Sequence, residues 1–165
     1  MTHPQQAVPA PDELVRRHAT QGATLMVILH AIQDEVGYVP PAVVPALARA
    51  LSLSRAEVHG VITYYHHFRS EPPARVTVQL CRAEACRSMG TEALAQHVEG
   101  HTGCKFDNGH HTETELESVF CLGQCALSPS MMINGELYAK VTPQKFDRLY
   151  ADARARTNAG TEETA

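Results

Sequence analysis

Four of the five cysteines in the 165-residue chain lie in two short pairs. Four residues separate Cys81 from Cys86, and three separate Cys121 from Cys125. Thiolates are soft anionic ligands, and two loops that each offer two of them can enclose a metal centre from two directions. The spacing therefore predicts a thiolate-ligated metal centre formed by Cys81, Cys86, Cys121 and Cys125.

Several thiolate chemistries compete for this pattern. A [2Fe-2S] cluster needs four thiolates from more than one direction, whereas structural zinc takes the same four in a tetrahedron, commonly with two residues between paired ligands. Both interpretations stay open at this point. A dithiol redox enzyme would need Cys-x-x-Cys and a Rieske centre would need two histidine ligands, and neither pattern occurs. The fifth cysteine, Cys104, has no partner at ligand spacing, and we expect it to be a spare thiol.

Each cysteine pair is expected to follow a β-strand. Val76, Val78 and Leu80 alternate with polar residues and lead into Cys81, and a second strand over residues 116–120 leads into Cys121. Between them we expect a helix closed by Gly100. The Asn134-Gly135 dipeptide predicts a hairpin, and Thr142-Pro143 begins a last helix. The order strand, helix, strand, hairpin, helix resembles a thioredoxin-like fold, in which both pairs would emerge at one edge of the sheet.

Helical patterns dominate the sequence before this region. Apolar residues at helical spacing predict a helix from Leu25 that stops at Gly37, and a second from Ala42 that carries Pro45 in its first turn. Ser54 and Glu57 have the spacing of a capping box, which predicts a third helix. The segment Ser70-Glu71-Pro72-Pro73 then marks a boundary, because its two prolines disfavour helix in the residues before them.

Composition excludes several functions. A net charge of -4 with both signs interspersed gives no basic face for nucleic acid. We expect no membrane span and a cytoplasmic protein, because the sequence shows no signal peptide and its strongest apolar run is too short to cross a bilayer. We also find no Ser/His/Asp set, phosphate-binding glycine loop or paired carboxylates, so no catalytic residue is predicted.

A family resemblance appears once the motifs are combined. The segments Ile28-Leu-His-Ala-Ile-Gln33, Gly37-Tyr-Val-Pro40 and Glu57-Val-His-Gly-Val-Ile-Thr-Tyr-Tyr65, with Phe68, precede the two cysteine pairs, which are followed by Gly90 and Pro129. Together they resemble the 24 kDa [2Fe-2S] subunit family of respiratory NADH dehydrogenase over roughly residues 25–150. The resemblance implies a [2Fe-2S] cluster with Cys81, Cys86, Cys121 and Cys125 as its ligands.

Within that family, Cys81-Arg-Ala-Glu-Ala-Cys86-Arg-Ser-Met-Gly90 and His66-His-Phe-Arg69 look most like the gamma subunit of NAD-dependent molybdenum formate dehydrogenase. This resemblance implies an electron-transfer subunit with its cluster next to the FMN and NAD site. Its partners would be an FMN- and NAD-binding beta (diaphorase) subunit and, through it, a molybdenum-containing alpha subunit that oxidises formate to CO2. The alternatives are the equivalent subunit of respiratory NADH dehydrogenase or of a bidirectional NAD-reducing hydrogenase diaphorase, a free-standing ferredoxin, and a structural adaptor stapled by a metal.

The expected fold class is α+β, with an N-terminal helical bundle followed by a thioredoxin-like [2Fe-2S] ferredoxin domain. The expected boundaries are a disordered N-terminus at residues 1–11, a helical docking domain at 12–70, the thioredoxin-like domain at 74–152 and a disordered tail at 153–165.

Overall fold

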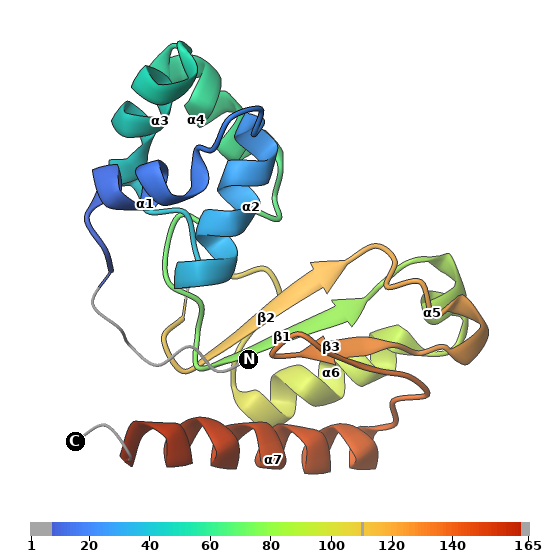
Figure 1. Cartoon of the computed structure of the whole chain (residues 1–165). Coiled ribbons are helices and arrows are strands. Elements are labelled where there is room, and N and C mark those ends of the chain that lie inside the picture. The colour runs from blue at the N-terminus through green and yellow to red at the C-terminus, as the bar shows by residue number, and fades with distance from the viewer. Residues whose placement is uncertain (1–7, 110, 163–165) are drawn as a thin grey trace. The chain divides into compact units, whose positions relative to one another are not determined.

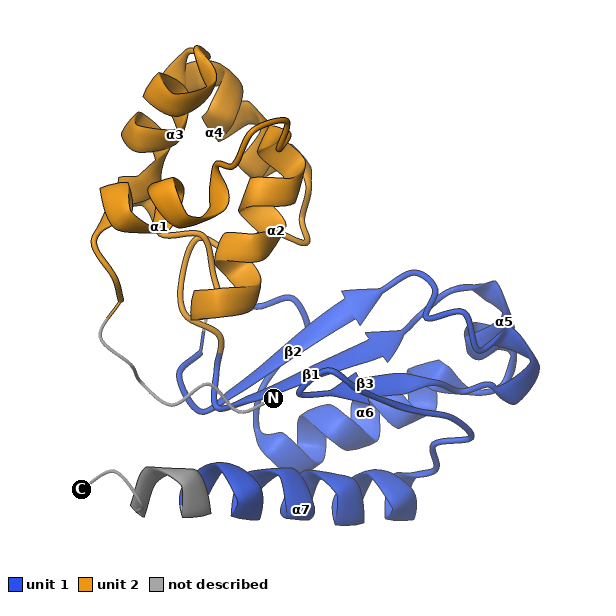
Figure 2. Cartoon of the chain, in the orientation of Figure 1, with its two compact units in different colours: residues 1–4, 74–165 blue, residues 5–73 orange. Residues whose placement is uncertain are grey.

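A computed structural model of the chain describes residues 8–109 and 111–162, with side chains as far as residue 158. The chain divides into two compact units, with the change between Pro73 and Ala74 (Figure 2). The first is built from helices and the second from a mixed sheet with helices. Each unit has a hydrophobic core of its own.

The helical unit contains α1 (Pro11–His18), α2 (Leu25–Val36), a 3-10 turn (Pro41–Val43), α3 (Val44–Leu51) and α4 (Arg55–Tyr64). Three of these helices follow the predicted patterns. Sequence reasoning missed α1, a short and mostly polar helix, although it begins with proline and has acidic residues in its first turn. The predicted disorder of residues 1–11 falls largely on residues 1–7, which lie outside the described part of the chain.

Local rules account for the helix ends in this unit. Gly37 has a φ of 85°, which glycine reaches without steric cost, and it ends α2. Pro45 lies in the first turn of α3, where its missing N–H is not needed. The predicted capping box is confirmed: Ser54 Oγ accepts a hydrogen bond from the Glu57 N–H at 3.1 Å, and the Glu57 carboxylate accepts one from the Ser54 N–H at 2.7 Å.

The second unit is a four-stranded sheet in the order β2-β1-β3-β4. Its strands are β1 (Val76–Cys81), β2 (Thr114–Val119), β3 (Met131–Ile133) and β4 (Glu136–Tyr138), with β1 and β2 parallel and the other two pairs antiparallel. The helices are α5 (Glu84–Ser88), α6 (Thr91–Thr102) and α7 (Pro143–Glu162), with a 3-10 turn at Cys125–Leu127. The combination of helices and mixed sheet confirms the predicted α+β class.

The core of this unit lies on one face of the sheet. Val76, Val78 and Leu80 of β1 are buried, while Thr77 and Gln79 between them are partly exposed. Helices α6 and α7 pack together on the same side of the sheet (Figure 1). Their buried side chains complete the core with Leu94, Val98 and Phe146. The alternating pattern predicted for β1 therefore reflects one covered face and one polar face.

Three details differ from the sequence predictions. Helix α6 passes Gly100 and ends at Gly103, whose φ is 73°. Sequence reasoning missed α5, which has a single turn. Helix α7 continues to Glu162, although disorder was predicted from residue 153, because alanines with high helix propensity extend it and Ala153 packs beside Tyr150 in the core. Residues 163–165 are not described.

Among the described helices, none has the length and apolar character needed to cross a bilayer.

Candidate metal centre

The parallel pairing of β1 and β2 brings the first cysteine of each pair to the same edge of the sheet. In the register of these strands, Cys81 lies opposite Val119, two residues before Cys121. The Arg82 N–H donates to the Val119 carbonyl at 2.8 Å and continues the pairing past the strand end. Cys81 and Cys121, which are far apart in sequence, thus emerge at the same edge of the sheet, as predicted from the sequence.

The first pair is buried. Cys81 is 2% exposed and Cys86 is 1% exposed, because α5 turns the chain back against the 3-10 turn that contains Cys125. The Cys86 Sγ atom lies 3.3 Å from Ser128 Oγ and 3.5 Å from Ser130 Oγ. The Ser128 hydroxyl donates to the Cys125 carbonyl at 2.8 Å. Its single proton is therefore committed, and Ser130 has the hydroxyl that can donate to a Cys86 thiolate.

The second pair is exposed and lies in a tightly wound loop. The Sγ atoms of Cys121 and Cys125 are 3.9 Å apart. Cys121 has a φ of 138°, a strained conformation for a residue with a side chain. Gly123 has a φ of 73°, and its N–H donates to Cys121 Sγ at 3.4 Å. Gly123 thus turns a backbone N–H toward a cysteine sulfur.

Electrostatics couple the four thiols. Burial raises the pKa of the Cys86 thiol, but the polar surroundings that Ser128, Ser130 and Cys81 provide outweigh it and hold the pKa below its ordinary value. The pKa of Cys125 is raised, first by the hydrogen bond and charge of Cys121, then by burial and by the charges of Cys86 and Cys81. The charges of the other three thiolates therefore disfavour a thiolate at Cys125, and a bound metal cation would offset that repulsion.

The thiols form two pairs rather than one tetrahedron. Cys121 and Cys125 are one pair, and the Cys81 thiol lies close enough to that of Cys86 to lower its pKa. Among the described residues, no three cysteine sulfurs lie within 4.8 Å of one another. Four sulfurs around one zinc ion would all be about 3.8 Å apart, given a Zn–S distance of about 2.3 Å. Two neighbouring pairs fit the two irons of a [2Fe-2S] rhomb better.

Arg82 follows the first cysteine, and its charge is already paired. Its guanidinium binds the Glu92 carboxylate, with Nε 3.1 Å from Oε1, and lies over the Phe106 ring at 5.9 Å. The hydrogen bond to Glu92 raises the pKa of Arg82 further. The structure therefore pairs this positive charge with Glu92 and does not leave it free beside the cysteine sulfurs.

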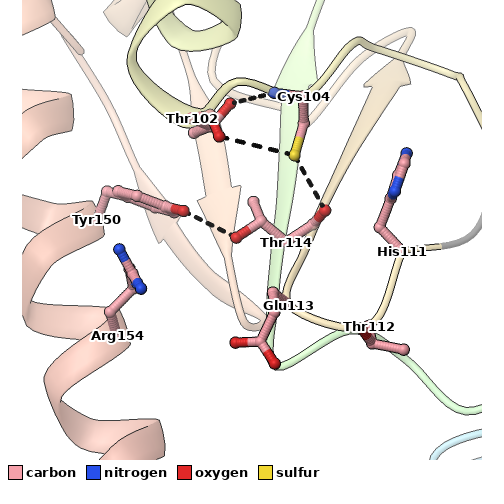
Figure 3. A pocket seen from close by; sticks show the side chains of 8 residues that line it. All are labelled: Thr102, Cys104, His111, Thr112, Glu113, Thr114, Tyr150 and Arg154. Carbon is pink, nitrogen blue, oxygen red and sulfur yellow. Dashed lines mark hydrogen bonds between the residues drawn. The ribbon is translucent and has the colours of Figure 1, made fainter.

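Cys104 lies in a different place, as its lack of a partner at ligand spacing suggested. Its Sγ atom donates to the carbonyls of Thr102 at 3.8 Å and Thr114 at 3.5 Å. Figure 3 shows it on the wall of a separate pocket of about 300 Å³, where Tyr150 hydrogen-bonds Thr114 at 2.7 Å. Cys104 is therefore a half-buried thiol with local hydrogen bonds, separate from the four paired cysteines.

Sequence reasoning did not identify Ser128 and Ser130 as neighbours of the Cys86 sulfur. Both follow the second cysteine pair, whereas the sulfur belongs to the first. The pairing of β1 with β3 brings them together, and the Cys81 N–H donates to the Ser130 carbonyl at 3.1 Å. No local sequence signal predicts a contact that depends on strand pairing.

Comparison with known proteins identifies the chain's relatives. Residues 11–154 match the family described as thioredoxin-like [2Fe-2S] ferredoxin. An NADH-quinone oxidoreductase subunit from Rhizobium meliloti is 30% identical over 152 residues, which cover 90% of this chain and 89% of that protein. An NADH-quinone oxidoreductase subunit from Mycobacterium tuberculosis is 29% identical over 150 residues, which cover 88% of this chain. The match spans only 58% of the mycobacterial protein.

A solved structure shares the fold. The crystal structure of an NAD+-reducing [NiFe]-hydrogenase in the H2-reduced state matches with a TM-score of 0.68 at 21% identity, over 79% of this chain and 22% of that one.

Proposed function

Because the chain belongs to the thioredoxin-like [2Fe-2S] ferredoxin family, we propose that it is an electron-transfer subunit with the cluster held by Cys81, Cys86, Cys121 and Cys125. The observation that carries this proposal is the meeting of two thiol pairs at one sheet edge. A bound [2Fe-2S] cluster supplies reversible one-electron chemistry. It would let a two-electron hydride carrier such as a flavin exchange electrons with one-electron centres.

The residues around the thiols would set the properties of the centre. Burial of Cys81 and Cys86 excludes water from one side. The Gly123 N–H and the Ser130 hydroxyl lie where they can donate to sulfur, and such hydrogen bonds stabilise the reduced, more negative state.

The exposed side of the centre is suited to a partner. Cys121 and Cys125 are exposed, and three apolar side chains within three residues of a cysteine are also exposed: Met89 at 62%, Phe120 at 77% and Leu127 at 41%. Exposed apolar residues grouped around a functional site are typical of protein interfaces. We propose that this rim (Met89, Phe120 and Leu127) contacts the subunit that exchanges electrons with the centre.

The helical unit is proposed as a second docking element, over residues 12–70. It has an apolar groove of about 480 Å³ lined by Leu25, Leu53, Glu57, Gly60, Val61, Tyr64 and Tyr65. The side chain of Tyr64 is 75% exposed. The proposed occupant is the same flavin-bearing subunit, since a partner held at two places would fix the distance between the centre and its flavin.

The proposed partner is an FMN- and NAD-binding subunit of a larger complex in the cytoplasm. The relatives favour a complex of the NADH-quinone oxidoreductase or NAD-reducing hydrogenase type, because those are the functions named for them. A formate dehydrogenase with a molybdenum-containing alpha subunit is the finer proposal, supported only by the motifs at Cys81–Gly90 and His66–Arg69.

The first test is electron paramagnetic resonance (EPR) of the dithionite-reduced chain, with iron and sulfide measured on the same sample. The proposal predicts a rhombic spin-half signal and about two irons per chain. An EPR-silent chain that holds one zinc ion would overturn it and support the adaptor stapled by a metal.

The second test identifies the complex. The native assembly, isolated through a tag on this chain, is analysed for molybdenum and nickel and assayed for NAD reduction by formate and by H2. Molybdenum with formate-dependent reduction supports formate dehydrogenase. Nickel with H2-dependent reduction supports hydrogenase, and quinone reduction by NADH with neither metal supports the respiratory type.

A further inference from the structure

A second group of metal-ligand side chains lies between α6 and α7. His97 and His101 are four residues apart on α6, so both point from the same face of the helix. Asp147 on α7 lies opposite them. His97 Nε2 is 2.7 Å from Asp147 Oδ1, and His101 Nδ1 is 3.3 Å from the same oxygen.

We propose that His97, His101 and Asp147 bind a divalent transition-metal ion, most readily Zn²⁺, that links α6 to α7. The two imidazole nitrogens and the carboxylate oxygen lie within 4.8 Å of one another. Zinc ligands at about 2.0–2.2 Å in a tetrahedron are about 3.3–3.6 Å apart, so small side-chain rotations bring these atoms to ligand distance. Two imidazoles and one carboxylate are a ligand set that zinc takes in proteins.

Aromatic packing holds the imidazoles in place. The His97 and His101 rings stack with centroids 6.0 Å apart. The Phe146 ring meets both edge-on, with centroids at 6.3 Å and 5.8 Å, and the Tyr150 ring meets His101 at 5.7 Å. Phe146 is completely buried and precedes Asp147 on α7, so the core itself orients the ligands. A site with ligands oriented by rigid neighbours loses little entropy when it binds the ion.

The fourth coordination position faces solvent. The exposed fraction of the side chain is 34% for His97, 38% for His101 and 37% for Asp147. A three-ligand zinc site with an open position binds water or a ligand from outside. The metal would fasten the two helices that cover the sheet, so its expected effect is on the stability of this unit, and the inference stands without the proposed electron-transfer role.

The experiment uses the full chain with its cluster, oxidised and purified without a polyhistidine tag. Zn²⁺ is titrated by calorimetry while visible absorption reports the cluster. We expect one bound Zn²⁺ per chain, an unchanged cluster spectrum and a higher thermal unfolding midpoint. His101→Ala and Asp147→Asn should each weaken binding at least about tenfold, whereas His59→Ala, an exposed histidine on α4, should leave it unchanged.

Several outcomes overturn the proposal. They are no Zn²⁺ binding, equal affinity in His101→Ala, loss of binding in Cys104→Ser, and binding that occurs only as the cluster loses iron. X-ray absorption at the zinc edge of the unmodified protein supplies a test that needs no variant. A nitrogen and oxygen shell supports the site, and sulfur in the shell contradicts it.

Discussion

The Oγ atom of Ser130 lies 3.5 Å from the Sγ atom of Cys86, and Ser130 has no exposed surface. The contact joins β3 to the buried pair of thiols. Because the neighbouring Ser128 hydroxyl donates to a backbone carbonyl, Ser130 provides the hydrogen bond that can respond to charge on the Cys86 sulfur.

Ser130→Ala should lower the reduction potential of the [2Fe-2S] cluster. The lost hydrogen bond stabilised the reduced state, and a bond worth about 1 kcal/mol corresponds to about 40 mV for one electron. Potentiometric titration followed by EPR measures the shift. Ser88→Ala is the control, since its hydroxyl donates to the Ala85 carbonyl on the exposed side of α5. Equal potentials in Ser130→Ala and the unmodified protein would show that Ser130 does not donate to the sulfur.

Cys86→Ser should abolish the normal EPR signal and lower the iron content, because a soft thiolate ligand is replaced by a hard hydroxyl. The isolated complex should still contain the chain if the role of the centre is electron transfer, whereas a failure to assemble would support the structural adaptor. Cys104→Ser is the matched control and should keep about two irons per chain. Loss of the cluster in that variant would contradict the assignment of Cys104 as a spare thiol.

Phe120→Asp should weaken attachment to the flavin-bearing subunit and slow electron transfer, since a charge at the centre of an apolar contact must be desolvated. The EPR signal of the isolated chain should stay unchanged, because the Phe120 side chain is 77% exposed. Co-purification and NADH-dependent reduction of the cluster measure the effect. Leu137→Asp, at an exposed position on β4, is the control. An equal effect in that variant would contradict the proposal that the rim contacts the partner.

Ser54→Ala should destabilise α4 by about 1 kcal/mol, the usual value of an N-cap side chain. The Ala side chain cannot accept the hydrogen bond of the Glu57 N–H. Hydrogen exchange of the α4 amides measures the change, and Ser70→Ala in the connection between the units is the control. Unchanged protection in Ser54→Ala would show that tertiary packing alone holds the start of this helix.

The capping box of Ser54 and Glu57 also predicts that the stability of α4 depends on pH. A hydrogen bond from the Ser54 backbone lowers the pKa of Glu57 below its ordinary value of 4.5. The ionised Glu57 carboxylate therefore contributes fully to stability above pH 4.5, and this contribution is lost as the pH falls through the lower pKa of the folded state. Protection of the α4 amides should exceed that of Glu57→Gln at pH 6, and the two should converge in acid. A difference that persists in acid would exclude the carboxylate as its cause.

Many features of this protein follow from short stretches of its sequence. The period-two pattern of β1, the Asn134-Gly135 hairpin and the Ser54 capping box depend on neighbouring residues, and the structure has all three. The cysteine spacing and the motifs of the helical unit were sufficient to indicate the family. Local rules worked because each of these features is stabilised within about ten residues.

Other features depend on tertiary packing. Helix α7 continues through its alanines because Ala153 packs in the core, which no hydrophobic periodicity indicates. The contact of Ser130 with Cys86 exists only because β3 pairs with β1, and Asp147 meets the histidines of α6 only because two helices cover one face of the sheet. These contacts join residues 44 to 50 positions apart, so their geometry follows from packing and not from local sequence.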